Sequence, residues 1–537
     1  MLKINSITIV GGGTAGWMTA STIVKAFPHI SITVIEPSGA ETIGVGESTI
    51  GGIRAWTNFI GLQDSDFLKE TDGSYKLSIK FTDFYEKNGE SFHYPFGEPY
   101  LENSPLQLMD WFYKKHYYPE TPWDDYVRSL FPTTFLYENN KFNENKYQEF
   151  GNFDIKRDVA FHFDATKFGL YLKNNFCIPN GVKVIDALVT DIATGKDGIE
   201  HITLDNGDTV ASDLYIDCSG FKSLLLGGAM KEPFESWSDK LPNNRAWATR
   251  IQYKDKEKEL EGFTNCTAIE NGWCWNIPLW SRLGAGYVYS DNFVNSDDAK
   301  EEFKKYLMSD KMVVPRTRGE VDELEFKDIP FRVGVYQRTF VKNVVGIGLS
   351  AAFIEPLESN GLYSIHEFLF KLVDILSREQ KISQFDKDIF NASCRGLFSG
   401  FAEFVGLHYA LSHRCDTEYW KAVSEREFDK DVLGKYTPKV YGYSHFGMTY
   451  MDKWEYSLDR SGVTWIATGQ HVNMINSARV QTLEQMFGID YKKTVDEFIR
   501  INTINKAKWK AAAELSPTLY TYLNDNYYFE ETEKGDQ

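Results

Sequence analysis

A glycine-rich turn between a β-branched run and a helical run is the feature that most constrains this chain. In SITIVGGGTAGWMTAS, Gly11, Gly13 and Gly16 form G-x-G-x-x-G at a strand-to-helix junction. The first glycine allows the tight turn, the second lets a pyrophosphate approach the backbone, and the third lets the helix pack closely on the strand. The next predicted strand, ISITVIEP, ends in Glu36, whose carboxylate can accept the ribose hydroxyls. These features predict a dinucleotide site, and Glu36 favours FAD or NAD over NADP.

Two later segments favour FAD over NAD. An apolar strand in SDLYIDCSGF runs into Asp217, and TFVKNVVGIGLSAAFIEP predicts another strand, a glycine-bearing turn containing Ile347, and a helix. The N-terminus of that helix can face the pyrophosphate or the flavin ring. Three cofactor-contacting segments spread so widely suit FAD, which is usually a resident, buried cofactor. The fold predicted is therefore α/β, with a Rossmann-type dinucleotide domain.

Composition and patterning set the broad organisation. Residues 1–385 are predicted to form the cofactor and catalytic module, with aromatic-rich substrate insertions at about 85–150 and 230–330. Residues 386–537 are predicted to form a mainly helical capping region. Its last stretch, NDNYYFEETEKGDQ, is expected to be a mobile polar tail. A net charge of −18 argues against a nucleic-acid partner. Because no apolar run is long enough to span a membrane and the six cysteines form no CxxC pair, we expect a soluble cytoplasmic protein with no metal site.

A family resemblance rests on GWCWNIPLW, which contains W-x-W-x-I-P as Trp273, Trp275, Ile277 and Pro278. Further motifs follow in the expected order: GGGTAGWM, GVGEST, YKLSIKF, FHFDA, IDCSGF, EPLESNG and HYALSHRCDTEYW. Together they resemble the flavin-dependent halogenases of the tryptophan-halogenase family, over residues 1 to about 425. The resemblance implies a flavoprotein monooxygenase-like fold, in which the dinucleotide domain is interleaved with a substrate domain.

The resemblance also implies a mechanism. FADH2 from a separate reductase, delivered by diffusion, reacts with O2 to give a flavin hydroperoxide, and a halide (chloride, bromide or iodide) attacks it to give hypohalous acid. A lysine then directs that oxidant onto a small, electron-rich aromatic substrate. Neither nucleic acid nor a membrane is an expected partner, and assembly into a homo-oligomer is expected.

The implied catalytic pair is Lys76 and Glu358. Lys76 would hold the electrophilic halogen, and Glu358 would stabilise the cationic ring intermediate and accept its proton. Lys80 is interpreted as a solvated residue, although in one continuous strand it would share a face with Lys76. Asn360 and Gly361, at a helix N-terminus, would bind the halide. Glu355 is expected either to face the flavin or to make a structural pair.

The remaining implied residues surround the flavin and the substrate. The W-x-W-x-I-P residues are expected to crowd the flavin and deny organic substrates close approach. Cofactor contacts are expected from Gly11, Gly13, Thr14, Ala15, Gly16, Glu36, Gly46, Glu47, Ser48, Asp217 and Ile347.

Phe96, Tyr94 and His93 are the expected substrate-lining residues. Tryptophan-specific members carry a histidine two positions before the phenylalanine, where this chain has Tyr94. No segment after residue 425 matches the family's amino-acid-binding lid, although KVYGYSHFGMTYMDKWEYSLDR is aromatic enough to line a pocket. We therefore expect a substrate of indole or phenol type other than free tryptophan.

Two alternatives remain open at this stage. A flavin-dependent aromatic hydroxylase would share the fold but lack the paired tryptophans, and it would consume NAD(P)H without a partner. A non-catalytic flavin-binding protein would retain oxidised FAD and form no halogenated product.

Overall fold

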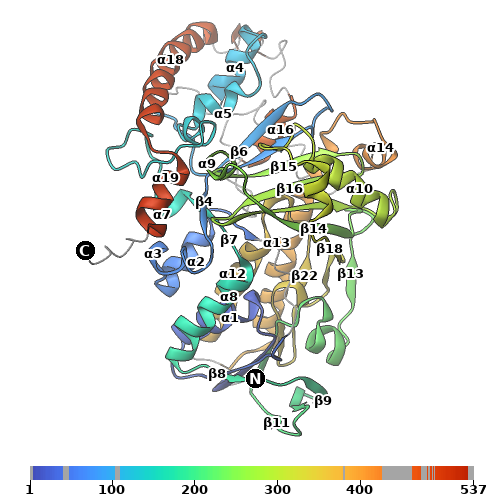
Figure 1. The fold of residues 1–537 in the computed structure, drawn as a ribbon. Helices are drawn as coiled ribbons and strands as arrows, with labels where there is room; N and C mark the ends of the chain where they lie inside the picture. The colour runs from blue at the N-terminus through green and yellow to red at the C-terminus, as the bar shows by residue number, and fades with distance from the viewer. Residues whose placement is uncertain are drawn as a thin grey trace, which may run out of the picture.

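Two large sheets with a small one between them form the body of the protein (Figure 1). The computed structural model describes residues 4–39, 47–102, 109–378, 381–425, 462–472, 480–481, 484–485, 488 and 490–529. The first sheet contains the predicted glycine turn. Its strands run in the order β20 (Phe340–Val341), β21 (Val344–Gly346), β12 (Leu214–Asp217), β1 (Ser6–Val10), β2 (Ser31–Ile35) and β8 (Lys183–Ile185).

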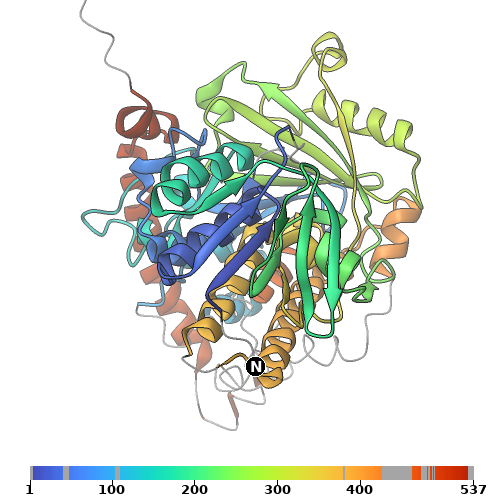
Figure 2. The same cartoon turned by 90° about the horizontal axis from the view of Figure 1, so that it is seen from below.

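The first sheet is parallel except for its edge strand β20. On β1, Ile7, Thr8 and Ile9 are all fully buried, so both faces of this central strand are covered, as parallel sheets require. Helix α1 (Thr14–Ala26) follows β1 and packs against α8 (Ala165–Tyr171) and α12 (Gly361–Ser377). Seen from below, blue, green and orange segments lie together here (Figure 2). The predicted α/β class and interleaved dinucleotide unit are therefore confirmed.

The second large sheet has seven strands. Their order is β18 (Lys327–Pro330), β14 (Arg245–Gln252), β17 (Arg282–Tyr289), β16 (Gly272–Pro278), β15 (Phe263–Ile269), β5 (Ser78–Thr82) and β6 (Ser91–Pro95). All of its pairs are antiparallel except β5 with β15. Helix α10 (Ser296–Leu307) packs on β14 and β17. The two aromatic-rich stretches singled out in the sequence thus supply most of this sheet.

The three-stranded sheet β3 (Glu47–Ser48), β7 (Ala160–Phe163) and β4 (Ser74–Lys76) lies between the large sheets. Leu77 separates β4 from β5, and its N–H donates to the carbonyl of Gly262 at 2.7 Å. Lys76 therefore ends a strand of the small sheet, whereas Lys80 lies within the seven-stranded sheet. The two lysines therefore do not share one continuous strand, because the chain changes sheets between them.

The described residues beyond Ser383 are mainly helical. They form α13 (Gln384–Ala410), α14 (Glu418–Ser424), α16 (Gly462–Gly469), α18 (Tyr491–Leu515) and α19 (Leu519–Leu523). Helix α13 begins at a capping box between Ser383 and Asp386. Helix α18 packs against α4 (Met109–Tyr117) and α5 (Asp125–Leu130), at the top left of Figure 1. Among the described residues, no helix is long and apolar enough to cross a membrane.

The start of the predicted tail belongs to the body of the protein. Tyr528 stacks on Trp280 with ring centroids 4.0 Å apart, and its hydroxyl donates to the carbonyls of Leu68 and Gly73. The expectation of a mobile tail is therefore wrong for this aromatic portion, because its rings are used in packing. The aromatic segment KVYGYSHFGMTYMDKWEYSLDR and residues 530–537 lie outside the described residues.

Candidate active site

The three glycines of the turn have the surroundings that a dinucleotide requires. Gly11 has φ +113°, and a Cβ on it would lie 2.3 Å from the carbonyl oxygen of Cys218. A Cβ on Gly16 would lie 2.0 Å from the carbonyl of Gly11, so only glycine allows this helix–strand contact. A Cβ on Gly13, by contrast, would meet nothing within 4 Å. The open space beside Gly13, at the N-terminus of α1, fits a pyrophosphate.

Glu36 lies beside this turn, directly after β2. A Cβ on Gly12 would overlap the Glu36 carboxylate, so the turn and the acid are in contact. The carboxylate also forms an ion pair with Lys173, a residue that sequence reasoning missed. Thr14 and Ala15 begin α1, but the Thr14 hydroxyl donates to the carbonyl of Ala165 at 2.9 Å. A contact from Thr14 to a dinucleotide would therefore come from its backbone.

Asp217 and Ile347 both make hydrogen bonds to backbone groups in and beside the first sheet. One carboxylate oxygen of Asp217 accepts from the backbone N–H groups of Leu225 and Leu226 at 2.7 and 2.8 Å, and the other accepts from Ser219. Ile347 is fully buried, and its N–H donates to the carbonyl of Asp217 at 3.0 Å. Because backbone N–H groups donate to both carboxylate oxygens, the predicted contact of Asp217 with a cofactor would come from its backbone.

Gly46 lies outside the described residues, but its neighbours Glu47 and Ser48 form β3. Burial raises the pKa of the Glu47 carboxyl to about 7, although the Lys76 charge opposes that shift. The Ser48 hydroxyl accepts a hydrogen bond of 3.1 Å from the hydroxyl of Ser359. β3 thus connects the region after the second strand to the turn that contains Glu358.

Lys76 is completely buried at the end of β4. Its Nζ donates to the carbonyl of Thr49 and to the hydroxyl of Ser359, each at 2.9 Å. The same nitrogen lies 5.0 Å from the centre of the Phe96 ring. Burial lowers the pKa of the Lys76 ammonium to about 7, although Cys266, Glu358 and Glu47 oppose this shift. A buried lysine with this pKa is available as a neutral amine near neutral pH.

Glu358 is brought into the same chamber by a short 3-10 turn, Pro356–Glu358. It is 4% exposed, and its Oε1 lies 2.7 Å from Nε2 of His408. That contact lies within ion-pair distance but is not aligned as a hydrogen bond; among the described residues, neither carboxylate oxygen has a hydrogen-bond partner. Sequence reasoning missed His408, although it is the first residue of the motif HYALSHRCDTEYW.

Glu355 has a different environment from Glu358. Its Oε2 accepts hydrogen bonds from Trp273 Nε1 at 2.9 Å, Asn243 Nδ2 at 2.6 Å and Tyr409 Oη at 2.9 Å. Burial raises the pKa of this carboxyl, and the three donors oppose the shift. Of the two roles expected for Glu355, the structure supports the structural pair, since Glu355 fixes the first tryptophan of the W-x-W-x-I-P motif.

That motif forms β16, in which every residue is buried. The Trp273 and Trp275 rings are 6.1 Å apart and tilted by 57°, as expected for residues on one face of a strand. Trp275 fits against Gly286, where an added Cβ would lie 2.0 Å from the indole. Ile277 and Pro278 continue the strand, and the Pro278 carbonyl accepts from Ser74, two residues before Lys76. The motif is thus connected to both Lys76 and Glu355.

Asn360 and Gly361 begin α12, the helix that follows Glu358. Ser359 has φ +55°, and Asn360 is the N-cap residue without a side-chain capping bond. The Asn360 Nδ2 atom is buried, and it has no hydrogen-bond partner among the described residues. An unpartnered buried donor at the N-terminus of a 17-residue helix fits a small anion such as a halide.

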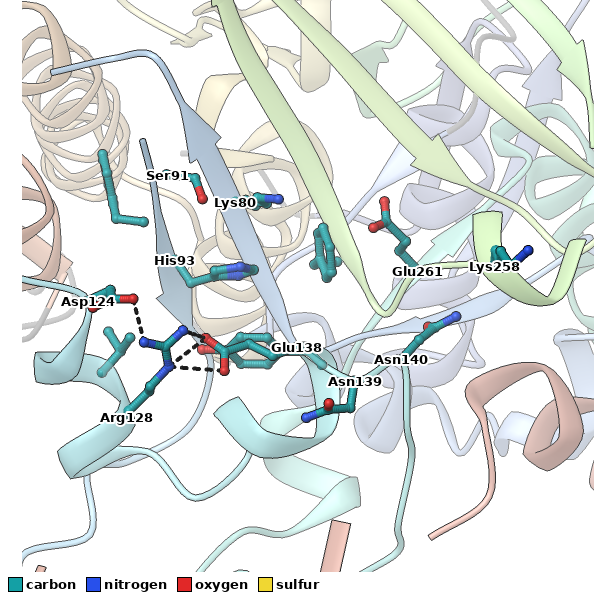
Figure 3. Close-up of a pocket in the computed structure, with 14 residues that line it drawn as sticks. Lys80, Ser91, His93, Asp124, Arg128, Glu138, Asn139, Asn140, Lys258 and Glu261 are labelled. Atoms are coloured by element: carbon teal, nitrogen blue, oxygen red, sulfur yellow. Dashed lines mark hydrogen bonds and ion pairs between the residues drawn. The ribbon is translucent and has the colours of Figure 1, made fainter. Parts of the chain in front are cut away.

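Of the three predicted substrate-lining residues, His93 and Tyr94 lie on opposite faces of β6, and Phe96 follows directly after it. Tyr94 packs edge-on against Phe96 and Phe404, with ring centroids 6.0 and 6.2 Å apart. His93 pairs directly across the sheet with Lys80, so both point to the opposite face from Tyr94. They line a separate cavity of about 630 Å³ with Arg128, Glu138 and Glu261 (Figure 3). The structure therefore brings Phe96 to Lys76 and separates His93 from it, because alternate residues of a strand face opposite ways.

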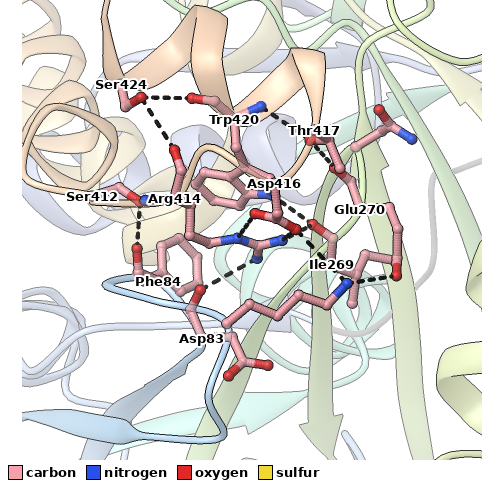
Figure 4. Close-up of polar contacts among 12 residues, drawn as sticks. Asp83, Phe84, Ile269, Glu270, Ser412, Arg414, Asp416, Thr417, Trp420 and Ser424 are labelled. Atoms are coloured by element: carbon pink, nitrogen blue, oxygen red, sulfur yellow. Dashed lines mark hydrogen bonds and ion pairs between the residues drawn. The ribbon is translucent and has the colours of Figure 1, made fainter.

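The end of α13, which carries His408, is fixed to the seven-stranded sheet by a buried arginine (Figure 4). Arg414 donates to the carbonyls of Asp83 and Ile269 and pairs with Asp416 at 2.8 Å. Trp420 Nε1 also donates to the carbonyl of Ile269, at 2.6 Å. These bonds, all from the HYALSHRCDTEYW motif, position the helix beside Glu358. Among the described residues, no three histidines, cysteines or acids are grouped to hold a metal.

Comparisons with known proteins agree with this geometry. The tryptophan halogenase family model matches residues 6–472. Tryptophan 6-halogenase ThaL of Streptomyces albogriseolus is 32% identical over 453 residues, which cover 81% of each chain. The solved structure titled VirX1 apo structure is 34% identical, with a TM-score of 0.87 over 99% of this chain and 100% of that one. BrvH, a flavin-dependent halogenase from Brevundimonas sp. BAL3, is 28% identical, with a TM-score of 0.82 over 97% of this chain and 99% of its own.

Proposed function

The chain belongs to the tryptophan halogenase family, and we propose that Lys76 and Glu358 perform its halogenation chemistry on an electron-rich aromatic ring. The enzyme is a flavin-dependent halogenase that uses FADH2 from a separate reductase, O2 and halide. When bound beside Gly11, Gly13 and Gly16, reduced FAD supplies, with O2 and halide, the hypohalous acid. The chain's own residues decide where that oxidant goes.

Lys76 receives the electrophilic halogen as a neutral amine. A neutral amine has two N–H bonds, and the two acceptors at 2.9 Å, Thr49 and Ser359, use both of them. The nitrogen lone pair is then left to accept a hydrogen bond from hypohalous acid or to bond to its halogen. In the second case the oxygen–halogen bond breaks, and the oxygen leaves as water with one proton from the nitrogen. The lowered pKa of Lys76, about 7, makes this neutral state accessible. The full burial of Lys76 keeps bulk water away from the oxidant.

Glu358 acts on the ring after the halogen has been transferred. Its carboxylate stabilises the cationic ring intermediate and accepts the proton from the halogenated carbon. The observation that carries this proposal is the position of Ser359, which follows Glu358 directly and accepts a hydrogen bond from Lys76. The proposed acid–base residue is therefore the immediate neighbour in sequence of a serine that contacts the proposed halogen carrier.

The substrate is proposed to be of indole or phenol type and different from free tryptophan. The printed names of several curated relatives describe tryptophan halogenases, which makes tryptophan the essential comparison. In this chain, however, Tyr94 stands beside Phe96, and its ring fills space against Phe404. The bulky phenol side chain of Tyr94 therefore reduces the room for an indole beside Phe96.

Three further features belong to the proposal. The reductase delivers FADH2 by diffusion, since the oxidant chemistry needs only the reduced cofactor itself. The enzyme assembles as a homo-oligomer. It works in a reducing cytoplasm, in keeping with its six free cysteines.

A product assay tests the function. The protein is supplied with reduced FAD, air, and chloride, bromide or iodide separately, together with indole, phenol or tryptophan. Mass spectrometry should show halogenated products with the chlorine or bromine isotope pattern. Indole or phenol should be halogenated faster than tryptophan. Hydroxylated products without halogen would instead support an aromatic hydroxylase, and tightly held oxidised FAD with no product would support a non-catalytic flavoprotein.

A further inference from the structure

His408 makes two contacts that bear on its protonation. Its Nδ1 lies 2.9 Å from the carbonyl oxygen of Phe404, one turn earlier in α13. A carbonyl can only accept, so Nδ1 carries a hydrogen. On the other side of the ring, Nε2 lies 2.7 Å from Oε1 of Glu358, and His408 itself is completely buried.

A neutral imidazole with its hydrogen on Nδ1 presents a lone pair at Nε2. A carboxylate oxygen 2.7 Å away also presents lone pairs, and two such atoms repel strongly where both side chains are buried. One proton on the pair removes the repulsion. The rings packed around His408 are apolar: the centroids of Phe81, Phe404 and Phe84 lie 4.9, 5.4 and 6.3 Å away.

The charged groups near the pair are few. Lys76 and Cys266 interact electrostatically with Glu358, and Glu355 interacts electrostatically with His408. Glu355 is already held by Trp273, Asn243 and Tyr409, and Lys76 by Thr49 and Ser359. Among the described residues, His408 is therefore the group in direct contact with the Glu358 carboxylate.

We infer that His408 is a positioning residue that stays protonated as an imidazolium and holds Glu358 as an anion, with Oε2 free for the substrate. This inference rests on the proposed function of Glu358. In the step it serves, the C–H bond at the halogenated carbon breaks, its electron pair restores the aromatic ring, and the proton passes to Oε2 of Glu358. His408 keeps its own proton, and Glu358 later releases the one it received. The absence of a partner for Oε2 among the described residues agrees with this role.

The protonation state is measured first, without turnover. In protein labelled with ¹⁵N-histidine, the His408 nitrogens should show imidazolium shifts at pH 8 in the wild-type protein and neutral shifts in Glu358→Gln. His366 is the matched reference: it is also fully buried, and burial lowers its pKa to about 3, so it should be neutral in both. Neutral shifts for His408 in the wild-type protein at pH 8 would overturn the inference.

The second measurement uses turnover of indole deuterated at its ring carbons. Wild-type enzyme should show no isotope effect, because loss of the proton is fast. His408→Gln should slow halogenation about tenfold and reveal a normal isotope effect, whereas His366→Gln should reveal none. Combining His408→Gln with Glu358→Gln should cost no more than Glu358→Gln alone, since His408 acts through Glu358. Additive losses without an isotope effect would refute the positioning role.

The two measurements separate this inference from the proposed function. An imidazolium signal that depends on Glu358, with no halogenated product from any substrate, would leave the pair intact and reject the function. Halogenated product together with a neutral His408 would support the proposed function and reject the inference about His408. Glu358→Gln leaves α13 unaltered, so the first test does not require that His408→Gln folds.

Discussion

The Nζ of Lys76 and the hydroxyl of Ser359 lie 2.9 Å apart although the two residues are 283 positions apart in sequence. The bond joins the end of β4 to the turn before α12, across the boundary between the small sheet and the helical layer. Since Ser359 follows Glu358, the same bond sets the separation of the proposed halogen carrier and the proposed base. Several functional predictions depend on this junction.

Glu358→Gln should slow halogenation by about 100-fold, the scale of a positioned acid–base group. The amide keeps the shape of the side chain but cannot accept the ring proton. Binding of FAD and consumption of O2 should persist, because Glu358 has no part in them. The measurement is product formation by mass spectrometry alongside an oxygen electrode. Halogenation at the wild-type rate would exclude Glu358 as the base.

Halogenation should increase as the pH rises through about 7, the pKa of Lys76. Below that pH the amine is protonated and has no lone pair for the halogen, whereas above it the neutral form predominates. Initial rates of product formation between pH 6 and 8.5 measure this, with reduced FAD supplied chemically so that no reductase limits the rate. Lys76→Arg provides the control, since a guanidinium stays charged throughout and should be inactive at every pH. A rate that falls as the pH rises would contradict a neutral amine.

Shrinking Trp275 should expose the flavin side to organic substrates. Trp275→Ala should form some hydroxylated product, at a cost of about 3–5 kcal/mol in stability because the side chain is buried. Trp275→Phe should retain halogenation, because it keeps an aromatic ring and the indole Nε1 has no hydrogen-bond partner among the described residues. Thermal unfolding measures the stability of both variants, and product analysis shows whether each forms halogenated or hydroxylated product. Loss of all products from folded, FAD-binding Trp275→Ala would argue against a screening role.

Gly13→Val should abolish FAD binding without unfolding the protein. A side chain at this position meets no protein atom within 4 Å, so it projects into the space proposed for the pyrophosphate. Gly319→Val is the matched control, since that glycine also faces open space but lies in α11 (Arg318–Asp322), in the segment that follows α10. Flavin fluorescence titration compares the two. Equal affinities would place the cofactor elsewhere.

Local patterns in the sequence predicted the cofactor side of the site better than the reaction side. The three glycines and Glu36 lie within one strand–helix–strand unit, so their spacing alone brings them together. The relative positions of Lys76 and Lys80 could not be predicted from their spacing, because the chain passes from one sheet to another at a single residue, Leu77. Likewise, Asp217 ends a strand as a ligand-binding acid would, but one of its oxygens accepts from Leu225 and Leu226 and the other from Ser219.

His408 was the most consequential omission. It stands 50 positions after Glu358, on a helix whose apolar pattern gives no sign of a functional residue. Only the tertiary contact, made when Arg414 fixes the end of α13 to the sheet, reveals the pairing. His93, by contrast, was favoured by its closeness in sequence to Phe96, and the alternation of β6 sends it to the other face.

The comparison of Lys76→Ala with Lys80→Ala tests the central claim most directly. The two lysines lie on strands that are consecutive in the chain but belong to different sheets. Lys76 is buried near Glu358, whereas Lys80 lines the separate cavity with His93. Halogenated product, FAD affinity and hydrogen peroxide release are measured for each variant with the same aromatic substrate. Lys76→Ala should lose halogenation while binding and reoxidising FAD and releasing oxidant, and Lys80→Ala should remain active. An active Lys76→Ala together with an inactive Lys80→Ala would contradict the account and assign the halogen to the other lysine.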